Sequence, residues 1–296
     1  MGDVKYSIVI IGAGKVGTAL GALLIKKGHR VDAAVARNAA TLEKAAPLLP
    51  GARLLTGGVR ELGQADVIFI TTNDGEIRKA CDDLAKRGTL LPKHTVIHTS
   101  GAGPLELLSS ARSAGAQVAS LHPIQSFASV ELALKQLPGS YFGLTAEGPA
   151  RDVALRIVDD LGGIAVDVAD KDKALYHAAA CVASNYLVAL LQLAQQLYKA
   201  AGFSGDAALK AMMPLVKGTL SNIEGVGTVA ALTGPIARGD VTIIKQHLNA
   251  LNKLSPDMAE LYKALGLRTA GIAAQKGTLK PEKAKEVIAL LKDGGC

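Results

Sequence analysis

Two stretches of the chain carry side chains suited to proton transfer at a carbonyl or imine. Ser100 lies in IHTSGAG, after one apolar run, and His122 lies in SLHPIQSF, at the end of the next. Unperturbed imidazole titrates near neutrality, so His122 is a candidate general acid or base. Pro123 restricts the residue before it to extended geometry, which would aim the imidazole. The alternative is a buried histidine that bonds only to backbone.

The elements around these residues alternate between strand and helix. Apolar, β-branched runs predict strands at 6–11, 30–36, 65–71, 94–99 and 116–122, with 139–146 and 163–168 extending the same sheet. Helix signals separate them: a stop at Gly28, a cap at Asn38, a capping pair at Asn73 and Glu76, and Pro104 in a first turn. This alternation predicts an α/β fold with a doubly wound parallel sheet, a Rossmann domain over 1–170.

The pattern changes after residue 170, and the domain over 171–296 is predicted to be all α. Helices are expected at 174–200, 205–222, 225–233, 241–254, 256–274 and 281–292. LTGPIARGD is an expected loop, in which Asp240 caps the next helix and Arg238 is free to bind an anion.

The first of these helices has no Asp, Glu, Lys or Arg over 174–198. Its polar residues argue against a bilayer span, and a helix buried inside a soluble domain is expected. On an ideal helix His177 and Ser184 lie about 20° apart, with Asn185 about 80° from His177. These groups need buried partners, which could be a substrate or neighbouring helices.

A glycine-rich turn predicts a dinucleotide site near the N-terminus. IIGAGKVGTAL contains G-x-G-x-x-G as Gly12, Gly14 and Gly17, after a strand and at the start of a helix. Gly12 permits the turn, Gly14 lets the backbone approach a pyrophosphate, and Gly17 allows close packing of helix on strand. A turn without ligand is the alternative. The expected cofactor-binding residues are Gly12, Ala13, Gly14, Lys15, Val16, Gly17, Arg37, Asn38, Thr71, Thr72, Asn73 and Ser100.

The end of the second strand predicts which dinucleotide binds. NAD sites place an acid there, but this strand ends in AVARN, and Asp32 lies near its beginning. Arg37 offers a planar fork suited to a 2′-phosphate, so NADP is favoured. An exposed surface charge is the alternative for Arg37.

These motifs also carry a resemblance. GAGKVG and VARN, followed by a helical domain, resemble the superfamily of 6-phosphogluconate dehydrogenase, ketopantoate reductase, pyrroline-5-carboxylate reductase and prephenate dehydrogenase. LHPIQSF, YHAAACVASNYLVALL and ALTGPIARGD resemble a family described as short-subunit dehydrogenase-like oxidoreductases, with a Rossmann-like domain and a C-terminal domain of unknown function. The resemblance implies NADP binding and a helical dimerisation domain.

The resemblance to prephenate dehydrogenases bears on Ser100 and His122. Those enzymes are similar in placing a Ser after one strand and a His-Pro after the next, where the pair faces the substrate near the nicotinamide. The residues after His-Pro and the expected cofactor differ here, so a prephenate substrate is not implied.

The composition of the chain limits the classes of partner that we expect. The 33 Lys and Arg against 26 Asp and Glu give +7 without a basic run, and aromatic residues are only 3%, so nucleic acid is not expected. Three scattered cysteines and an N-terminus without a signal-peptide pattern favour the cytoplasm. The apolar richness after residue 172 predicts a homodimer, and the polar residues within 174–198 argue against a membrane partner.

The sequence therefore predicts an NADP-dependent oxidoreductase that acts on a small, anionic carbonyl, imine or alcohol. The alternative is a non-catalytic NADP(H)-binding sensor or scaffold. For the oxidoreductase, the expected catalytic residues are His122, Ser100 and Asn185, and the expected substrate-binding residues are His177, Gln125 and Arg238.

Overall fold

The computed structural model describes residues 4–57, 62 and 64–293 and contains two compact units. The first unit is Met1–Tyr186 and the second is Leu187–Cys296. The ends Met1–Asp3 and Cys296, used above for localisation, lie outside the described residues.

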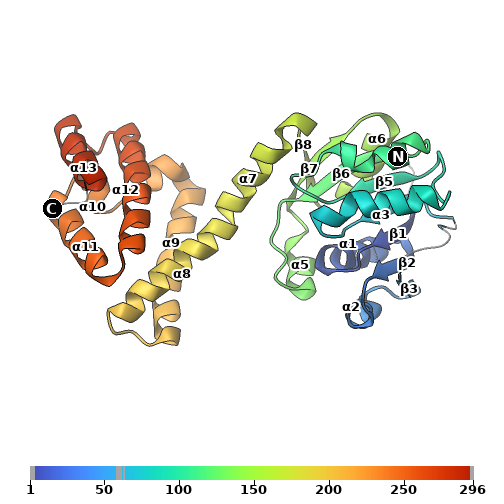
Figure 1. Cartoon of the computed structure of the whole chain (residues 1–296), viewed down its shortest axis with the longest axis horizontal. Helices are drawn as coiled ribbons and strands as arrows, with labels where there is room; N and C mark the ends of the chain where they lie inside the picture. Colours follow the sequence, from blue (N-terminus) through green and yellow to red (C-terminus); the bar gives the residue numbers. More distant parts are fainter. Residues whose placement is uncertain (1–3, 58–61, 63, 294–296) are drawn as a thin grey trace. The chain divides into compact units, whose positions relative to one another are not determined.

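The first unit is built on one eight-stranded sheet with the order β3-β2-β1-β4-β5-β6-β7-β8 (Figure 1). All neighbouring strands are parallel except β6 and β7, which are antiparallel. The strands are β1 (Ser7–Ile11), β2 (Arg30–Ala36), β3 (Arg53–Thr56), β4 (Val67–Ile70), β5 (Thr95–His98), β6 (Gln117–Pro123), β7 (Tyr141–Ala146) and β8 (Ile164–Asp167).

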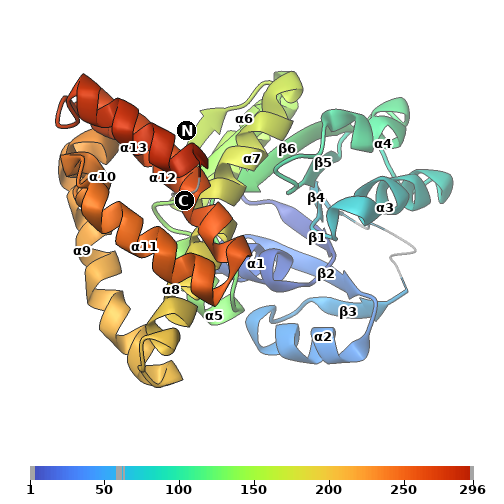
Figure 2. The same cartoon turned by 60° about the vertical axis from the view of Figure 1, so that its left-hand side comes forward.

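Helices cover both faces of this sheet (Figure 2). Alternate β1 residues belong to different apolar clusters: Ile8 and Ile10 to one, Val9 and Ile11 to the other. The helices are α1 (Lys15–Lys26), α5 (Val130–Gln136) and α6 (Gly148–Asp160) on one face, and α3 (Asp74–Lys86) and α4 (Ser109–Ser113) on the other, with α2 (Ala39–Ala45) after β2. A strand buried on both faces explains the continuous apolar runs in the sequence, and the predicted doubly wound fold is confirmed.

Several expectations about this unit were wrong in detail. RLLT forms the edge strand β3, and α5 forms after Ser129, whose side chain caps it. Asn38 caps α2 as expected, but Asn73 makes no side-chain cap bond to α3. Pro104 precedes a single 3₁₀ turn, Leu105–Leu108. The Leu105 N–H donates to Asp170 Oδ1 at 2.9 Å.

The long uncharged helix predicted over 174–200 is broken. α7 (Lys173–Ala183) ends at Ser184, and α8 (Asn185–Ala200) begins directly after it. The expected burial is also wrong for this chain, because α8 has no buried residue and Leu175 is 77% exposed. Among the described residues, Asp170–Ala200 is the one stretch long and apolar enough to cross a membrane, judged by length and composition alone.

The second unit is helical throughout its described residues. Its helices after α8 are α9 (Gly205–Ala231), α10 (Pro235–Arg238), α11 (Val241–Leu254), α12 (Pro256–Lys276) and α13 (Pro281–Asp293). Its core includes Ile244, Leu248 and Val287, each fully buried. Asp240 caps α11 as predicted, through a hydrogen bond from the Ile243 N–H. The predicted LTGPIARGD loop contains α10. The two helices expected at 205–222 and 225–233 correspond to α9, which is interrupted by the non-helical backbone of Gly227.

Candidate functional site

The glycine-rich turn joins β1 to α1 with the geometry that its sequence demands. Gly12 has φ +105°, and a Cβ there would lie 2.8 Å from the backbone of Thr71 and Thr72. A Cβ on Gly17 would overlap Thr71 Oγ1, which itself donates a 2.6 Å hydrogen bond to Gly12 O. No atom lies within 4 Å of the Cβ position on Gly14, so the turn leaves open space there. The roles predicted for Gly12 and Gly17 match this packing.

The N-terminus of α1 faces this space with free donors. Gly14 is its N-cap residue, so no side chain caps the first turn, and that turn carries no acidic residue. Free backbone N–H groups and the helix dipole favour an anion at such an end.

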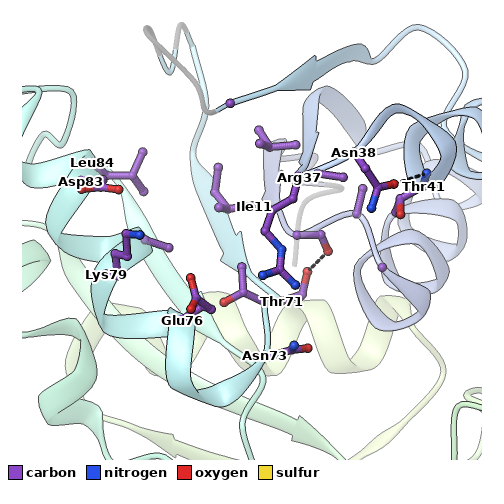
Figure 3. A pocket seen from close by; sticks show the side chains of 18 of the residues that line it. Ile11, Arg37, Asn38, Thr41, Thr71, Asn73, Glu76, Lys79, Asp83 and Leu84 are labelled. Atoms are coloured by element: carbon purple, nitrogen blue, oxygen red, sulfur yellow. Dashed lines mark hydrogen bonds between the residues drawn. The ribbon is translucent and has the colours of Figure 1, made fainter.

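A cavity of about 450 Å³ opens beside the turn (Figure 3). Its lining combines the turn, the end of β2, the loop after β4 and one face of α3. Eight of the predicted cofactor residues line it: Gly12, Ala13, Gly14, Arg37, Asn38, Thr71, Thr72 and Asn73. Lys15, Val16, Gly17 and Ser100 do not.

Arg37 is the most informative side chain in this cavity. Figure 3 shows it reaching into the cavity, across from Glu76 and Lys79 on α3. It is exposed and has no ion-pair partner among the described residues. Asn38 Oδ1 accepts the Thr41 N–H at 2.9 Å, which holds the side chain at the start of α2. Arg37 is the cation at this end that has no carboxylate partner among the described residues.

The sequence analysis missed the wall that α3 contributes. Glu76, Ala80, Asp83 and Arg87 line the cavity at a spacing of three or four residues, with Lys79 beside them, which is the pattern of one helix face. That periodicity was visible in the sequence. Nothing in a single helix pattern indicates which face meets a cavity.

A second polar cluster lies at the carboxyl ends of β5 and β6, in the same sheet. Its first member, Ser100, does not have the free hydroxyl that we expected. Ser100 Oγ accepts the Gly103 N–H at 2.8 Å, and Ser100 is 5% exposed. The hydroxyl oxygen thus closes the turn before Pro104, and the O–H has no acceptor among the described residues.

Lys173, at the start of α7, is the unexpected member of this cluster. The side chain is 2% exposed, and Nζ donates to Ser120 Oγ at 2.6 Å and to Ser100 O at 3.4 Å. Burial lowers the pKa of Lys173 to about 8. The sequence signal was available: a lysine immediately before 25 uncharged residues.

His98 is also buried beneath this edge. Its Nδ1 accepts the Ser100 N–H at 3.2 Å. Burial first, and then the positive charge of Lys173, lower the pKa of His98 to about 3, so its imidazole is neutral. The sequence analysis placed His98 inside a strand without assigning it a role.

His122 lies at the end of β6 between two consecutive residues of α7. Its Nδ1 is 2.7 Å from Tyr176 Oη, and its ring meets the His177 ring edge-on at 5.6 Å between centroids. Burial, followed by His177 and Lys173, lowers the pKa of His122 to about 4. The expectation of an imidazole that titrates near neutrality is therefore wrong for this site, because too little water reaches the ring to solvate its charged form.

The remaining predicted residues are placed as follows. His177 joins the cluster, and its buried Nδ1 has no hydrogen-bond partner among the described residues. The amide of Gln125 is occupied by Ser126, Gln136 and Ser140. Ser184 and Asn185, at the break between α7 and α8, are exposed. Arg238 is exposed at the end of α10, in the second unit.

Comparison with known domain families gives two matches. Residues 1–123 match a Rossmann-like domain, and residues 140–269 match a domain of unknown function, DUF2520. The chain thus combines these two domains, as the motifs predicted. The matches do not support the more specific label of a short-subunit dehydrogenase. A search among curated proteins finds no match.

Solved structures similar to this chain share its fold at low sequence identity. A "putative NADP oxidoreductase" from Bacteroides fragilis has a TM-score of 0.73 at 22% identity, covering 91% of this chain and 100% of its own. An imine reductase from Pseudomonas sp. has 0.62 at 17%, covering 94% and 100%. A Plasmodium falciparum pyrroline carboxylate reductase with NADP bound has 0.60 at 12%, covering 92% and 97%.

Proposed function

We propose that this chain is an NADP-dependent oxidoreductase that transfers a hydride between the nicotinamide and a small carbonyl, imine or alcohol. The observation that carries the proposal is Arg37, unpaired in a cavity that is also lined by Gly14, the N-cap residue of α1. Solved structures of the same fold include oxidoreductases, one of them with NADP bound, which agrees with this assignment.

The residues present fit such a cofactor. The open space over Gly14 and the free N–H groups of α1 suit a pyrophosphate, and the Arg37 guanidinium suits a 2′-phosphate. Bound NADPH would supply the hydride. The cluster around His122 lies two strands from β4, roughly 10 Å along the same sheet edge, which is within the length of a dinucleotide.

The charge of the cluster favours an anionic substrate. His98 and His122 are neutral near pH 7, and Lys173 retains most of its positive charge there. A carboxylate on the substrate would gain from that charge in a site poorly screened by water. In this proposal His122 hydrogen-bonds the reacting group and Lys173 sets the local potential.

Cofactor titration tests the proposal. NADPH should bind the wild type at least about tenfold more tightly than NADH, because charge-assisted hydrogen bonds to the extra phosphate are worth roughly 1.5–3 kcal/mol. Arg37→Ala should remove that preference. Arg53→Ala, an exposed arginine on β3 outside the cavity, is the matched control and should keep it. Equal affinities for both cofactors in the wild type would refute the NADP assignment.

Turnover separates an enzyme from a sensor. NADPH oxidation should appear with some members of a panel of 2-oxo acids, aldehydes and cyclic imines. Tight NADPH binding without turnover on the whole panel would favour a non-catalytic NADP(H)-binding protein.

A further inference from the structure

One ring nitrogen of His122 is held by Tyr176. Nδ1 and the phenol oxygen are 2.7 Å apart, and the two rings meet at 87°. The contact depends on Gly143, which pairs with His122 across β6 and β7. A Cβ on Gly143 would overlap the Tyr176 hydroxyl, so glycine there makes room for the phenol.

The direction of this hydrogen bond follows from the surroundings of the phenol. Burial raises the pKa of Tyr176 to about 12, so the phenol is protonated at neutral pH. Among the described residues, His122 Nδ1 is the one hydrogen-bond partner of the phenol oxygen. The phenol O–H is satisfied there when it donates to Nδ1, which then accepts. A neutral imidazole that accepts at Nδ1 carries its proton on Nε2.

Burial, His177 and Lys173 together keep His122 neutral. The titratable groups around it are His177, Tyr176 and Lys173 on α7, Asp74 on α3 and His98 on β5. Asp74 is the one acid that acts on the imidazole, and its effect is the smallest of the four causes, after burial, His177 and Lys173. A proton added to Nδ1 would also break the bond that Tyr176 makes.

The other ring nitrogen is available. Nε2 has no hydrogen-bond partner among the described residues and is not among their fully buried unpaired atoms. It lies over Gly101, where a Cβ would come within 2.9 Å of it. His122 thus presents one N–H donor, aimed over a residue that has no side chain.

We propose that Tyr176 is a positioning residue that holds His122 as a neutral Nε2–H donor, and that the acceptor atom recognised here is a carbonyl oxygen and not a protonated imine nitrogen. The substrate assignment rests on the proposed oxidoreductase function, whereas the role of Tyr176 does not.

The chemistry of the two acceptors differs in a way this donor can distinguish. When hydride from NADPH adds to a carbonyl carbon, the C=O π pair moves to oxygen, and one proton from solvent completes the alcohol. A neutral imidazole can supply the N–H that points at this oxygen. The hydrogen bond becomes stronger as negative charge develops on the oxygen. A protonated imine carries an N–H donor and a positive charge. Its N–H would face the His122 N–H, which is also a donor, and its charge would be repelled by the positive charge of Lys173.

Nitrogen NMR of the histidine side chains tests the positioning role without any turnover. His122 should show the neutral Nε2–H pattern from pH 5 to 8 in the wild type. Tyr176→Phe should convert it to a mixture of tautomers. Tyr262→Phe is the matched control, because Tyr262 holds His247 Nδ1 in the same way at 2.9 Å in the second unit, and it should leave His122 unchanged. An imidazolium or an Nδ1–H tautomer for wild-type His122 at pH 7 overturns the proposal.

The substrate panel tests the acceptor. Aldehydes or 2-oxo acids should oxidise NADPH faster than cyclic imines, and Tyr176→Phe should lower kcat on carbonyls at least about fivefold with NADPH affinity unchanged. Faster reduction of imines overturns the carbonyl assignment alone. Tight NADPH binding with no turnover on either class overturns it together with the enzymatic function, while the NMR result still decides the role of Tyr176.

Discussion

At the scale of single residues, burial determines the protonation of the candidate site. His122 was singled out from the sequence because His-Pro ends a strand, and the structure places it at the sheet edge as expected. Its protonation was not foreseen, because it depends on Lys173 and His177, more than 50 positions away in the chain. Ser100 shows the same limit, since its hydroxyl oxygen accepts the Gly103 N–H in a turn that the sequence pattern did not indicate.

Replacing His122 measures what its N–H contributes. His122→Ala should bind NADPH like the wild type and lose at least about tenfold in turnover, because positioned proton or hydrogen-bond donors typically contribute about 10²–10⁴-fold. The assay uses whichever compound of the panel oxidises NADPH fastest. His247→Ala, in the second unit, should keep full activity. Full activity in His122→Ala would make His122 a structural residue.

Lys173 should make the free energy of unfolding depend on pH. Its pKa is about 8 in the folded protein, below the ordinary value of 10.5, so the unfolded chain binds more protons between pH 8 and 10.5. Stability then rises with pH across that window as the buried ammonium loses its charge. Relative to Lys173→Met, the wild type should gain on the order of 1–2 kcal/mol between pH 7.5 and 9.5.

Urea unfolding at the two pH values measures this difference. Lys171→Met, which removes an exposed neighbouring lysine, should shift in parallel with the wild type. A wild type that loses stability relative to Lys173→Met over the same interval would contradict the lowered pKa.

At the scale of elements, apolar runs and glycine signals predicted most of the sheet. β2 and α11 have the predicted bounds, because the stop at Gly28 and the cap at Asn38 bracket β2 and the capping Asp240 defines the start of α11. β3 was missed since RLLT is short, partly exposed and at the edge of the sheet, where burial leaves little pattern. The antiparallel direction of β7 has no local signal either, because strand direction depends on the path of the whole connection.

The helical half shows why composition alone misplaces breaks. The uncharged run over 174–200 gave no reason for the break at Ser184. Conversely, a boundary was predicted between 222 and 225, whereas the irregular residue of α9 is Gly227, with φ 79° and ψ 167°. Two nearby glycines, Gly225 and Gly227, made either position plausible from sequence.

These two glycines offer a matched test. Gly227→Ala should destabilise the protein by about 1–3 kcal/mol, because its backbone conformation is almost restricted to glycine. Gly225→Ala should stabilise it by up to about 1 kcal/mol, since alanine is the better helix former. No atom lies within 4 Å of either Cβ position, so packing does not enter the comparison. Urea unfolding of both variants decides it, and equal effects would mean that α9 is straight at Gly227 in solution.

At the scale of the whole molecule, the chain exposes more large apolar side chains than a monomeric soluble protein normally does. In the second unit Val188 is 68% exposed, Leu215 65% and Val226 61%. Leu215 and Val226 are eleven residues apart on α9, which places them about 20° apart on an ideal helix. Large exposed apolar side chains such as these often mark a contact surface, and we use them as the basis for the expected homodimer.

We therefore expect a homodimer formed through the helical residues after about 172. Light scattering of the wild type at micromolar concentration should give about twice the chain mass of 30.4 kDa. The double variant with Leu215→Asp and Val226→Asp should be monomeric, because a desolvated carboxylate is costly at an apolar interface. Leu91→Asp, at a residue of the first unit that is 48% exposed, should remain dimeric. A monomeric wild type would refute the dimer, and a protein recovered only in detergent would instead assign the exposed apolar stretch Asp170–Ala200 to a membrane.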